Sequence, residues 1–319
     1  MKIVIPDDYQ DAIRTLECFA KLAGHEVTIY RDTVRDLDTL AARFQDADAL
    51  ILIRERTSIT ESLLARLPKL KLISQTGRGI PHIDVEACTR HRVAVAVGGG
   101  SPYATAELTW GLVLAALRHI PQEVAAMKQG RWQSTLGLGL RGRTLGILGY
   151  GKIGSVVAGY GRVFGMNVLV WGREGSLTRA QADGYAVAIS QCDLFERADV
   201  VSLHVKLMAD TRGIVTAADL AAMKPSALLV NTSRAELIEA GALAAAVKAG
   251  RPGMAAVDVY EAEPVIDHPL LHLDNVICTP HLGYVEKDSY EQYFGSAIDQ
   301  LVAFAAGQPV ELVNPQVRA

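Results

Sequence analysis

The chain has 319 residues, of which 50% are hydrophobic and 21% are charged, and its formal net charge is -3. This length is natural for two domains, and the balance of apolar and charged residues argues against disorder. The small negative charge argues against nucleic acid or an anionic membrane surface as the main partner. No signal-peptide core opens the chain, and its longest apolar stretch, Leu108 to Leu117, is too short to cross a bilayer.

The four cysteines are scattered, at Cys18, Cys88, Cys192 and Cys278. They lack the paired spacing of a metal site, so we expect no bound metal. Unpaired thiols favour a reducing cytoplasm, and we expect all four to be buried as small apolar side chains.

Short apolar strands alternate with amphipathic stretches through the first hundred residues. The expected strands are Lys2–Pro6, Glu26–Tyr30, Ala49–Ile53, Lys71–Ser74 and Val93–Val97. The amphipathic stretches between them are Tyr9–Ala20, Leu37–Phe44, Ile59–Leu67 and Ile83–His91. This alternation predicts a parallel sheet covered by helices on both faces.

A breaker cluster from Gly98 to Pro102 ends this pattern and is a hinge candidate. A helical pair is expected next, from Tyr103 to Arg131, with a break near Ile120-Pro121. The strand pattern then resumes with Leu145–Leu148, Val168–Trp171, Val200–Leu203, Ala227–Val230, Ala255–Val259 and Val276–Thr279. The chain is therefore predicted to be α/β, with two open parallel-sheet units in series.

The last expected helix, Asp288 to Ala306, carries one apolar face. That face consists of Tyr290, Tyr293, Phe294, Ala297, Ile298 and Leu301. The sequence pattern leaves open which unit this helix joins.

A glycine-rich turn lies between the strand Leu145–Leu148 and a stretch of helical apolar spacing. It reads Gly149-Tyr150-Gly151-Lys152-Ile153-Gly154. Strand, glycine turn and helix in this order are typical of a dinucleotide site, where the helix N-terminus attracts the pyrophosphate. The alternative is an ordinary glycine-rich loop.

Three polar residues follow three of the later strands, where open α/β sheets bind ligands. Arg234, in Asn-Thr-Ser-Arg, can grip a carboxylate through two parallel hydrogen bonds. Glu263 follows in Asp-Val-Tyr-Glu-Ala-Glu-Pro, and His281 in Thr-Pro-His-Leu-Gly can transfer protons near neutral pH. Taken singly, each also fits a surface or structural residue.

Together these three motifs resemble the D-2-hydroxyacid dehydrogenase family, and the resemblance covers essentially the whole chain. Ala106-Glu107-Leu108, Ser202-Leu203-His204 and Met223-Lys224-Pro225 match the family as well. The resemblance implies a flavodoxin-like substrate-binding domain, residues 1–99 plus 287–319, and a Rossmann NAD(P)-binding domain, residues 100–286. It also implies an active-site cleft between these domains.

The resemblance implies that a hydride passes between the nicotinamide and C2 of a small 2-oxo or D-2-hydroxy acid. His281 would exchange the proton, Glu263 would orient and charge the imidazole, and Arg234 would bind the substrate carboxylate. Asp258 would orient the nicotinamide carboxamide.

The expected cofactor contacts are the six residues of the glycine turn together with Gly172, Arg173, His204, Thr232, Asp258 and His281. The acid that usually follows the second strand of such a domain is absent at Gly172. Arg173 can instead receive a 2′-phosphate, so NADP is expected beside NAD, although Glu174 weakens this argument. In the alternative, Arg173 stacks on adenine or faces solvent.

Two further departures from the family pattern are Lys206, where a proline is usual, and Ala235 after Arg234, where a glycine is usual. On the substrate side, the resemblance implies backbone contacts from Gly77, Arg78 and Gly79, and a contact from Arg54. We expect Arg54 and Arg56 to lie on one extended segment and to point the same way. Alternatively, both are surface arginines.

The resemblance further implies a cytoplasmic homodimer joined through Tyr103–Arg131. The chain looks similar to phosphoglycerate dehydrogenase-like proteins without their regulatory extension. Glyoxylate, hydroxypyruvate, phosphohydroxypyruvate and bulkier 2-oxo acids all remain open as substrates. A non-catalytic dinucleotide-sensing regulator of the corepressor type is the alternative function. A formate dehydrogenase is disfavoured because those relatives carry Gln at the position of Glu263.

Overall fold

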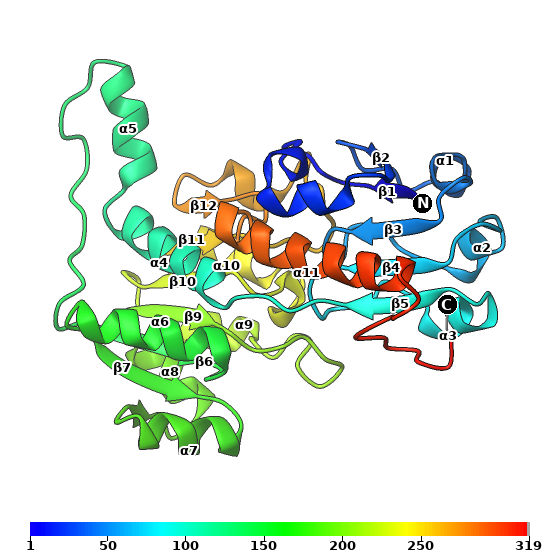
Figure 1. The fold of residues 1–319 in the computed structure, drawn as a ribbon. Helices are drawn as coiled ribbons and strands as arrows, with labels where there is room; N and C mark the ends of the chain where they lie inside the picture. Colours follow the sequence, from blue (N-terminus) through cyan, green and yellow to red (C-terminus); the bar gives the residue numbers. More distant parts are fainter. Residues whose placement is uncertain (318–319) are drawn as a thin grey trace. The chain divides into compact units, whose positions relative to one another are not determined.

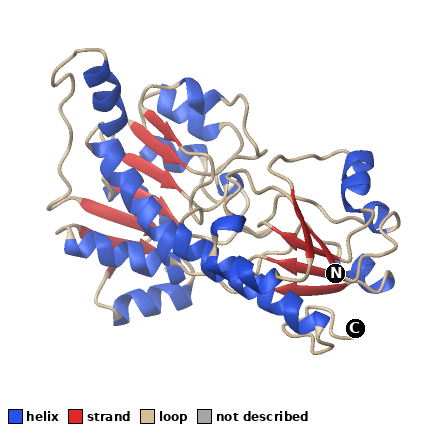
Figure 2. Cartoon of the chain, turned by 45° about the horizontal axis from the view of Figure 1, so that its top comes forward, coloured by secondary structure: helices blue, strands red, loops and turns tan. Residues whose placement is uncertain are grey.

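The computed structural model describes residues 1–317 and divides the chain into two compact units. Unit 1 contains Met1–Ser101 and the segment from Val285 onward, and unit 2 contains Pro102–Tyr284. Residues 318 and 319, which end the predicted substrate-binding domain, lie outside the described residues. Each unit has its own sheet with helices packed on it, which confirms the predicted α/β class (Figure 1, Figure 2).

The sheet of unit 1 has five parallel strands in the order β2-β1-β3-β4-β5. The strands are β1 (Lys2–Ile5), β2 (Glu26–Ile29), β3 (Ala49–Leu52), β4 (Leu72–Gln75) and β5 (Ala94–Val97). This is the flavodoxin-like order, in which ligands bind beyond the carboxyl ends of the strands.

Helices cover both faces of this sheet. One face carries α1 (Leu37–Phe44), α2 (Glu61–Leu64) and α3 (Val85–Arg90). On the strands β3, β4 and β5, α11 (Lys287–Ala305) packs together with the 3₁₀ segment η2 (Glu17–Leu22). Ser74 ties α11 to β4, because its hydroxyl donates to the carbonyl of Ala297 at 2.9 Å and lies 2.8 Å from Oε1 of Gln300. The buried face of α11 includes all six residues predicted for it.

The prediction of a helix over Tyr9–Ala20 is wrong. The segment forms two 3₁₀ pieces instead, η1 (Ile13–Thr15) and η2. Leu16 between them is extended, with φ -78° and ψ 144°, so no α-helix runs through it. The Asp8 carboxylate accepts hydrogen bonds from the amides of Ala12 and Ile13 at 3.1 Å and fixes the start of η1.

The sheet of unit 2 has seven parallel strands in the order β12-β11-β10-β9-β6-β7-β8. They are β6 (Thr144–Leu148), β7 (Asn167–Trp171), β8 (Ala186–Val187), β9 (Val200–Leu203), β10 (Leu228–Asn231), β11 (Met254–Val257) and β12 (Val276–Cys278). The six strands from β6 to β11 have the doubly wound order of dinucleotide-binding sheets, and β12 extends the sheet by one strand. The edge strand β8 was not predicted, because two residues carry no periodic pattern.

Alternating strand residues supply two cores on opposite faces of this sheet. Val168 and Val170 of β7 join the core under α4 (Tyr103–Leu117) and α6 (Lys152–Val163). Leu169 joins the other core, under α8 (Gln191–Arg197), α9 (Ala217–Ala222) and α10 (Ala242–Lys248). Both faces being buried explains why these strands read as continuous apolar runs.

The predicted helical pair consists of α4 and α5 (Ile120–Lys128), broken at His119, whose backbone is left-handed with φ 52°. In Figure 1, α5 and the segment after it extend beyond the rest of unit 2. Within the described chain, no helix is long and apolar enough to span a membrane.

The expectation for the cysteines holds only in part. Cys18 and Cys88 are buried, but Cys278 is half-buried and Cys192 is exposed, since it lies on the outer side of the short helix α8.

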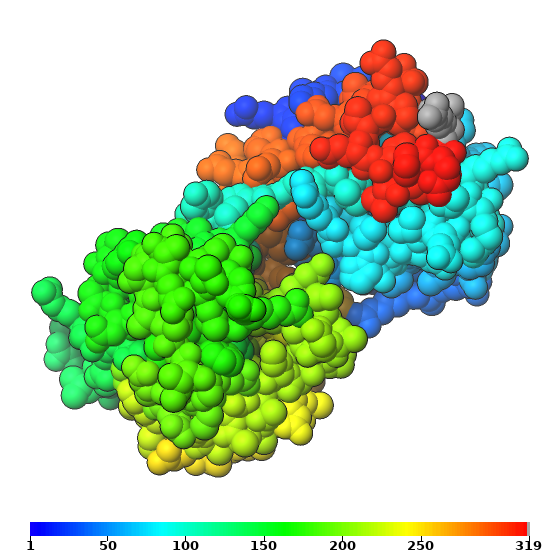
Figure 3. All heavy atoms as spheres, turned by 90° about the horizontal axis from the view of Figure 1, so that it is seen from below, coloured from blue at the N-terminus to red at the C-terminus, as the bar shows by residue number. Residues whose placement is uncertain are grey.

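The segment after α11 returns along the open edge of β5. Leu312 forms an antiparallel bridge with Ala96, and the amide of Val313 donates to the carbonyl of Val95 at 2.8 Å. Asn314 is buried and satisfies three groups: its Oδ1 accepts from the amide of Val95, and its Nδ2 donates to Val93 and Thr89. Figure 3 shows this last segment, in red, against the cyan residues of unit 1. The edge of the sheet is thereby covered.

We expect Asn314→Ala to lower the free energy of unfolding of unit 1 by about 1 to 3 kcal/mol, because buried donors and acceptors lose their partners. Amide hydrogen exchange at Val95 measures this local cost. The control is Gln316→Ala, which removes an exposed amide from the same tail. Equal protection of Val95 in both variants would contradict the assigned role of Asn314.

Candidate functional site

The glycine turn joins β6 to α6, and its three glycines have different surroundings. Gly149 has a left-handed backbone, with φ 94°, and a Cβ there would lie 2.8 Å from the carbonyl oxygen of His204. A Cβ at Gly154 would collide with the carbonyl oxygen of Gly149, so the helix packs directly on the turn. A Cβ at Gly151 would meet nothing within 4 Å. That open side is where a pyrophosphate can approach the N-terminus of α6.

Within the turn, the side chain of Tyr150 does not face this open side. It is buried, its hydroxyl donates to Oδ2 of Asp183 at 2.6 Å, and its ring packs edge-on against Tyr185. Burial and the Asp183 carboxylate both raise the pKa of Tyr150. Tyr150 therefore has only its main chain to offer to a ligand at this turn.

The carboxyl end of β7 carries Gly172 and Arg173. A Cβ at Gly172 would make ordinary contacts, the nearest at 3.5 Å from Cβ of Ser176, so there is room for a larger group. Arg173 caps α7 (Glu174–Ala182) and forms an ion pair with Asp210, with Nη2 and Oδ2 2.7 Å apart. This pairing was not predicted from the sequence.

The carboxyl end of β9 places His204 behind the glycine turn. Its Nε2 lies 2.9 Å from the hydroxyl of Ser202, and burial lowers the pKa of His204 to about 4. The imidazole is therefore neutral at physiological pH. Lys206, the departure from the family pattern, is exposed in the loop that follows.

The loop after β10 is organised by Asn231. Its Oδ1 accepts from the amide of Ser233 at 3.0 Å and its Nδ2 donates to the carbonyl of Arg234 at 2.9 Å. The hydroxyl of Ser233 donates to the carbonyl of Val205, which fixes the loop beside β9. Ala235 begins a 3₁₀ turn (η3, Ala235–Leu237) without a left-handed backbone, so the usual glycine is not required there.

The buried carboxylate of Asp258 holds the loop that follows β12. Its Oδ1 accepts from the hydroxyl of Thr279 at 2.6 Å and from the amide of Leu282 at 2.7 Å. Its Oδ2 accepts from the amide of Gly283 at 2.8 Å. Burial raises the pKa of Asp258 despite these bonds. Asp258 was expected to contact the nicotinamide. In the structure, both of its carboxylate oxygens accept hydrogen bonds from this loop.

The same loop presents His281 to Glu263. Nδ1 of His281 lies 2.6 Å from Oε2 of Glu263, and Oε1 of Glu263 accepts from the amide of Tyr260 at 3.0 Å. Burial raises the pKa of Glu263, but the His281 hydrogen bond and the nearby charges of His281 and Arg234 outweigh it, so the net shift is downward. The three residues predicted as a set are therefore one electrostatic group.

Two threonines of α4 contact these loops and were missed in the sequence analysis. Thr105 donates to the carbonyl of Gly283 at 2.8 Å. The hydroxyl of Thr109 lies 2.7 Å from that of Thr232, whose side chain is thus held inside unit 2. Their spacing of four residues on one helix was the only available signal, because such residues share a face.

In unit 1, the loop after β4 carries the predicted substrate contacts. Gly77 has φ 91°. Within the described residues, the amides of Gly77, Arg78 and Gly79 donate no hydrogen bond to the protein. Successive unpaired amides at a left-handed glycine are a common anion-binding arrangement.

The expectation that Arg54 and Arg56 share an extended segment is wrong. Arg54 has a left-handed backbone, with φ 55°, and begins a turn directly after β3. Its guanidinium lies over the ring of Tyr293 and beside Gly77. Arg56 turns elsewhere: it donates to the carbonyl of Asp7 at 2.8 Å and lies 4.3 Å from the ring centre of Tyr9.

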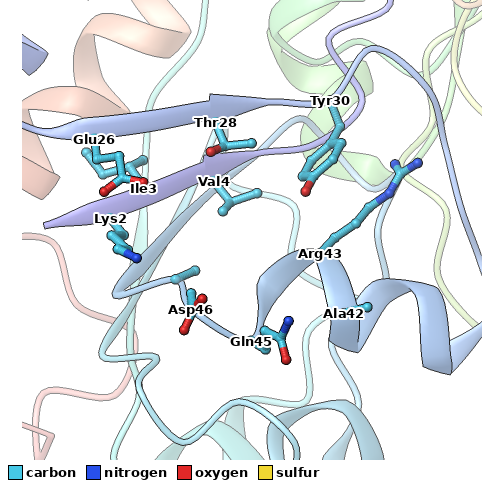
Figure 4. A pocket seen from close by; sticks show the side chains of 11 residues that line it. Lys2, Ile3, Val4, Glu26, Thr28, Tyr30, Ala42, Arg43, Gln45 and Asp46 are labelled. Atoms are coloured by element: carbon cyan, nitrogen blue, oxygen red, sulfur yellow. The ribbon is translucent and has the colours of Figure 1, made fainter.

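A separate pocket of about 220 Å³ lies between β1, β2 and α1 (Figure 4). Arg43 lies 4.3 Å from the ring centre of Tyr30 and is paired with Asp32, while Asp46 is paired with Lys69. None of its lining residues belongs to the predicted site. Among residues 1–317, no cluster of three or more His, Cys, Asp or Glu side chains could hold a metal ion.

Comparisons with known proteins show which family this chain is similar to. Residues 110–283 match the family described as "D-isomer specific 2-hydroxyacid dehydrogenase, NAD binding domain". A D-3-phosphoglycerate dehydrogenase of Methanocaldococcus jannaschii is 37% identical over 98% of this chain, which spans only 59% of that longer protein. A glyoxylate reductase of Aeropyrum pernix is also 37% identical, over 88% of this chain and 87% of its own. The crystal structure of a phosphoglycerate oxidoreductase from Vibrio cholerae O395 has 54% identity and a TM-score of 0.93, covering 96% of this chain and 99% of that one.

The lowered pKa of Glu263 gives a pH prediction. Pairing with His281 stabilises the fold above the ordinary carboxyl pKa of 4.5, and this contribution is lost as pH falls through the lowered value. In His281→Ala the Tyr260 hydrogen bond and the Arg234 charge remain, but the hydrogen bond and charge of His281 are lost, so the titration midpoint of Glu263 should rise, as ¹³C NMR of its carboxyl carbon can measure. The control, His272→Ala, removes an exposed histidine paired with Asp267 and should leave the midpoint unchanged.

Proposed function

Because this chain belongs to the D-isomer specific 2-hydroxyacid dehydrogenase family, we propose that it is an NAD(P)-dependent oxidoreductase of small D-2-hydroxy acids and 2-oxo acids. The observation that carries the proposal is the 2.6 Å contact between His281 and Glu263, within reach of the charge of Arg234. These residues lie on loops of the same sheet as the glycine turn.

The residues around the glycine turn fit a dinucleotide. The open side of Gly151 faces the first turn of α6, and the space at Gly172 accepts a ribose. Lys152 and Ile153 would contribute main-chain amides there, and His204 and Thr232 would line the neighbouring strand ends. The bound nicotinamide supplies or accepts the hydride, and the protein supplies orientation and charge.

The catalytic roles follow from which atoms are already engaged. Glu263 is bonded to Nδ1 of His281, so Nε2 is the atom that exchanges a proton with the substrate oxygen. The carboxylate also favours the charged imidazolium that reduction requires. Arg234 binds the substrate carboxylate with its planar guanidinium and polarises the adjacent carbonyl.

The remaining roles are divided between the units. Unit 2 is the cofactor domain, and unit 1 contributes the amides of Gly77, Arg78 and Gly79 to bind the substrate carboxylate. Arg54 assists them, because its guanidinium already lies beside Gly77. The protein acts in the reducing cytoplasm as a homodimer through Tyr103–Arg131, where several exposed apolar side chains support a partner surface. These are Tyr103, Ile120, Val124 and Met127.

A purely regulatory role, of the corepressor type, is not favoured. The relatives that match along the chain are named as dehydrogenases and reductases, and the Arg234, Glu263 and His281 set is intact.

The test is NAD(P)H oxidation with a panel of glyoxylate, hydroxypyruvate, phosphohydroxypyruvate and bulkier 2-oxo acids. Wild-type protein should turn over at least one of them, and His281→Ala should lose about 10² to 10⁴-fold in kcat with unchanged cofactor affinity, because it removes the proton donor. His272→Ala is the matched control. A loss of only two- or threefold, measured where chemistry limits the rate, would refute the role of His281.

We expect Arg234→Lys to behave as a severe change. Lysine keeps the charge but lacks the planar fork that binds a carboxylate in two places, so kcat/KM should fall substantially while cofactor binding is spared. Arg212→Lys is the control, since Arg212 is exposed and pairs only loosely with Glu236, at 3.8 Å. Wild-type kinetics for Arg234→Lys would place Arg234 away from the substrate.

A further inference from the structure

The inference concerns the choice between NAD and NADP and rests on the proposed function. The two cofactors differ only by a phosphate on the 2′-oxygen of the adenosine ribose. In doubly wound sheets, the residues just after the second strand face this oxygen, and an acid there favours NAD. In this chain, Gly172 and Arg173 occupy that place, and neither is acidic.

An acid nevertheless lies nearby, supplied by another loop. Asp210 belongs to the loop that follows β9, and its Oδ2 lies 2.7 Å from Nη2 of Arg173. The loop is held in shape by Thr211, whose hydroxyl accepts from the amide of Met208 at 2.7 Å and donates to the carbonyl of Lys206 at 2.8 Å. Asp210 is therefore presented to Arg173 by a hydrogen-bonded turn.

The surroundings of Gly172 could otherwise receive a phosphate. Ser176 lies against the space at Gly172, and its hydroxyl accepts a hydrogen bond from Arg179 at 3.2 Å. The proton of that hydroxyl is thus left for another acceptor. Charge decides whether a phosphate binds in this space. Asp210 neutralises Arg173, and Glu174 adds a second negative group in the first turn of α7.

We propose that Asp210 is a specificity residue for the cofactor. By pairing with Arg173 from the loop after β9, it disfavours a 2′-phosphate, as an acid just after the second strand does in doubly wound sheets. The ion pair is open to solvent, with side-chain exposures of 68% for Arg173 and 65% for Asp210. Releasing Arg173 should therefore give a modest change in affinity, of about three- to tenfold.

The experiment measures binding of two cofactor fragments by calorimetry, so it does not depend on turnover. The ligands are 5′-AMP, which lacks the 2′-phosphate, and adenosine 2′,5′-bisphosphate, which carries it. Asp210→Asn should tighten binding of the bisphosphate about three- to tenfold and leave 5′-AMP unchanged. Adding Arg173→Ala to this variant should abolish the gain.

The matched control is Asp274→Asn, which removes the same charge next to β12, at the opposite edge of the sheet from β7. A gain for Asp274→Asn equal to that for Asp210→Asn would mean that only net charge matters and would overturn the proposal. An unchanged preference in Asp210→Asn, or a gain that survives Arg173→Ala, would also overturn it. Failure of the wild-type protein to bind 5′-AMP would instead overturn the proposed cofactor site, which separates the two failures.

Discussion

The candidate site depends on the buried carboxylate of Asp258. A charged group without exposed surface is costly unless hydrogen bonds satisfy it, and three donors from residues 279–283 do so here. Those bonds hold a loop in which His281 itself has a left-handed backbone, with φ 51°. Without them, the loop would be free to move His281 away from Glu263. The position of the His281 side chain is therefore determined by the hydrogen bonds that its loop makes to Asp258.

The parallel sheet then brings the other groups together. Because β10, β11 and β12 are adjacent and parallel, the segments after them emerge at one edge, which puts Arg234, Glu263 and His281 in one electrostatic group. Helix α4 adds a second constraint, because Thr105 and Thr109 attach to two of these segments from the same helical face. Residues separated by more than a hundred positions in the chain are thus held by short-range bonds.

Much of the fold, and the loops that carry the candidate site, could be predicted from the sequence, because the strand patterns and the motifs are strong local signals. Buried parallel strands read as apolar runs, and the turn requires glycine at Gly149 and Gly154, where a Cβ would collide with backbone atoms. The predictions failed where tertiary contacts decide local structure. The hydrogen bonds of Asp8 and the extended backbone of Leu16 give 3₁₀ turns where a helix was expected. The turn at Arg54 separates Arg54 from Arg56, which were expected to point the same way. Side-chain pairs between distant loops, such as Arg173 with Asp210, leave no periodic trace in the sequence.

The discontinuity of unit 1 has a consequence for the order of folding during synthesis. Its sheet is built from the first hundred residues, but α11 and the tail that covers β5 are made only after all of unit 2. Unit 2 is continuous and can complete its own cores earlier. The sheet of unit 1 therefore stays open on one face and one edge until unit 2 has been synthesised. The domain that is begun first is finished last, which is the reverse of the usual N-terminal-first sequence.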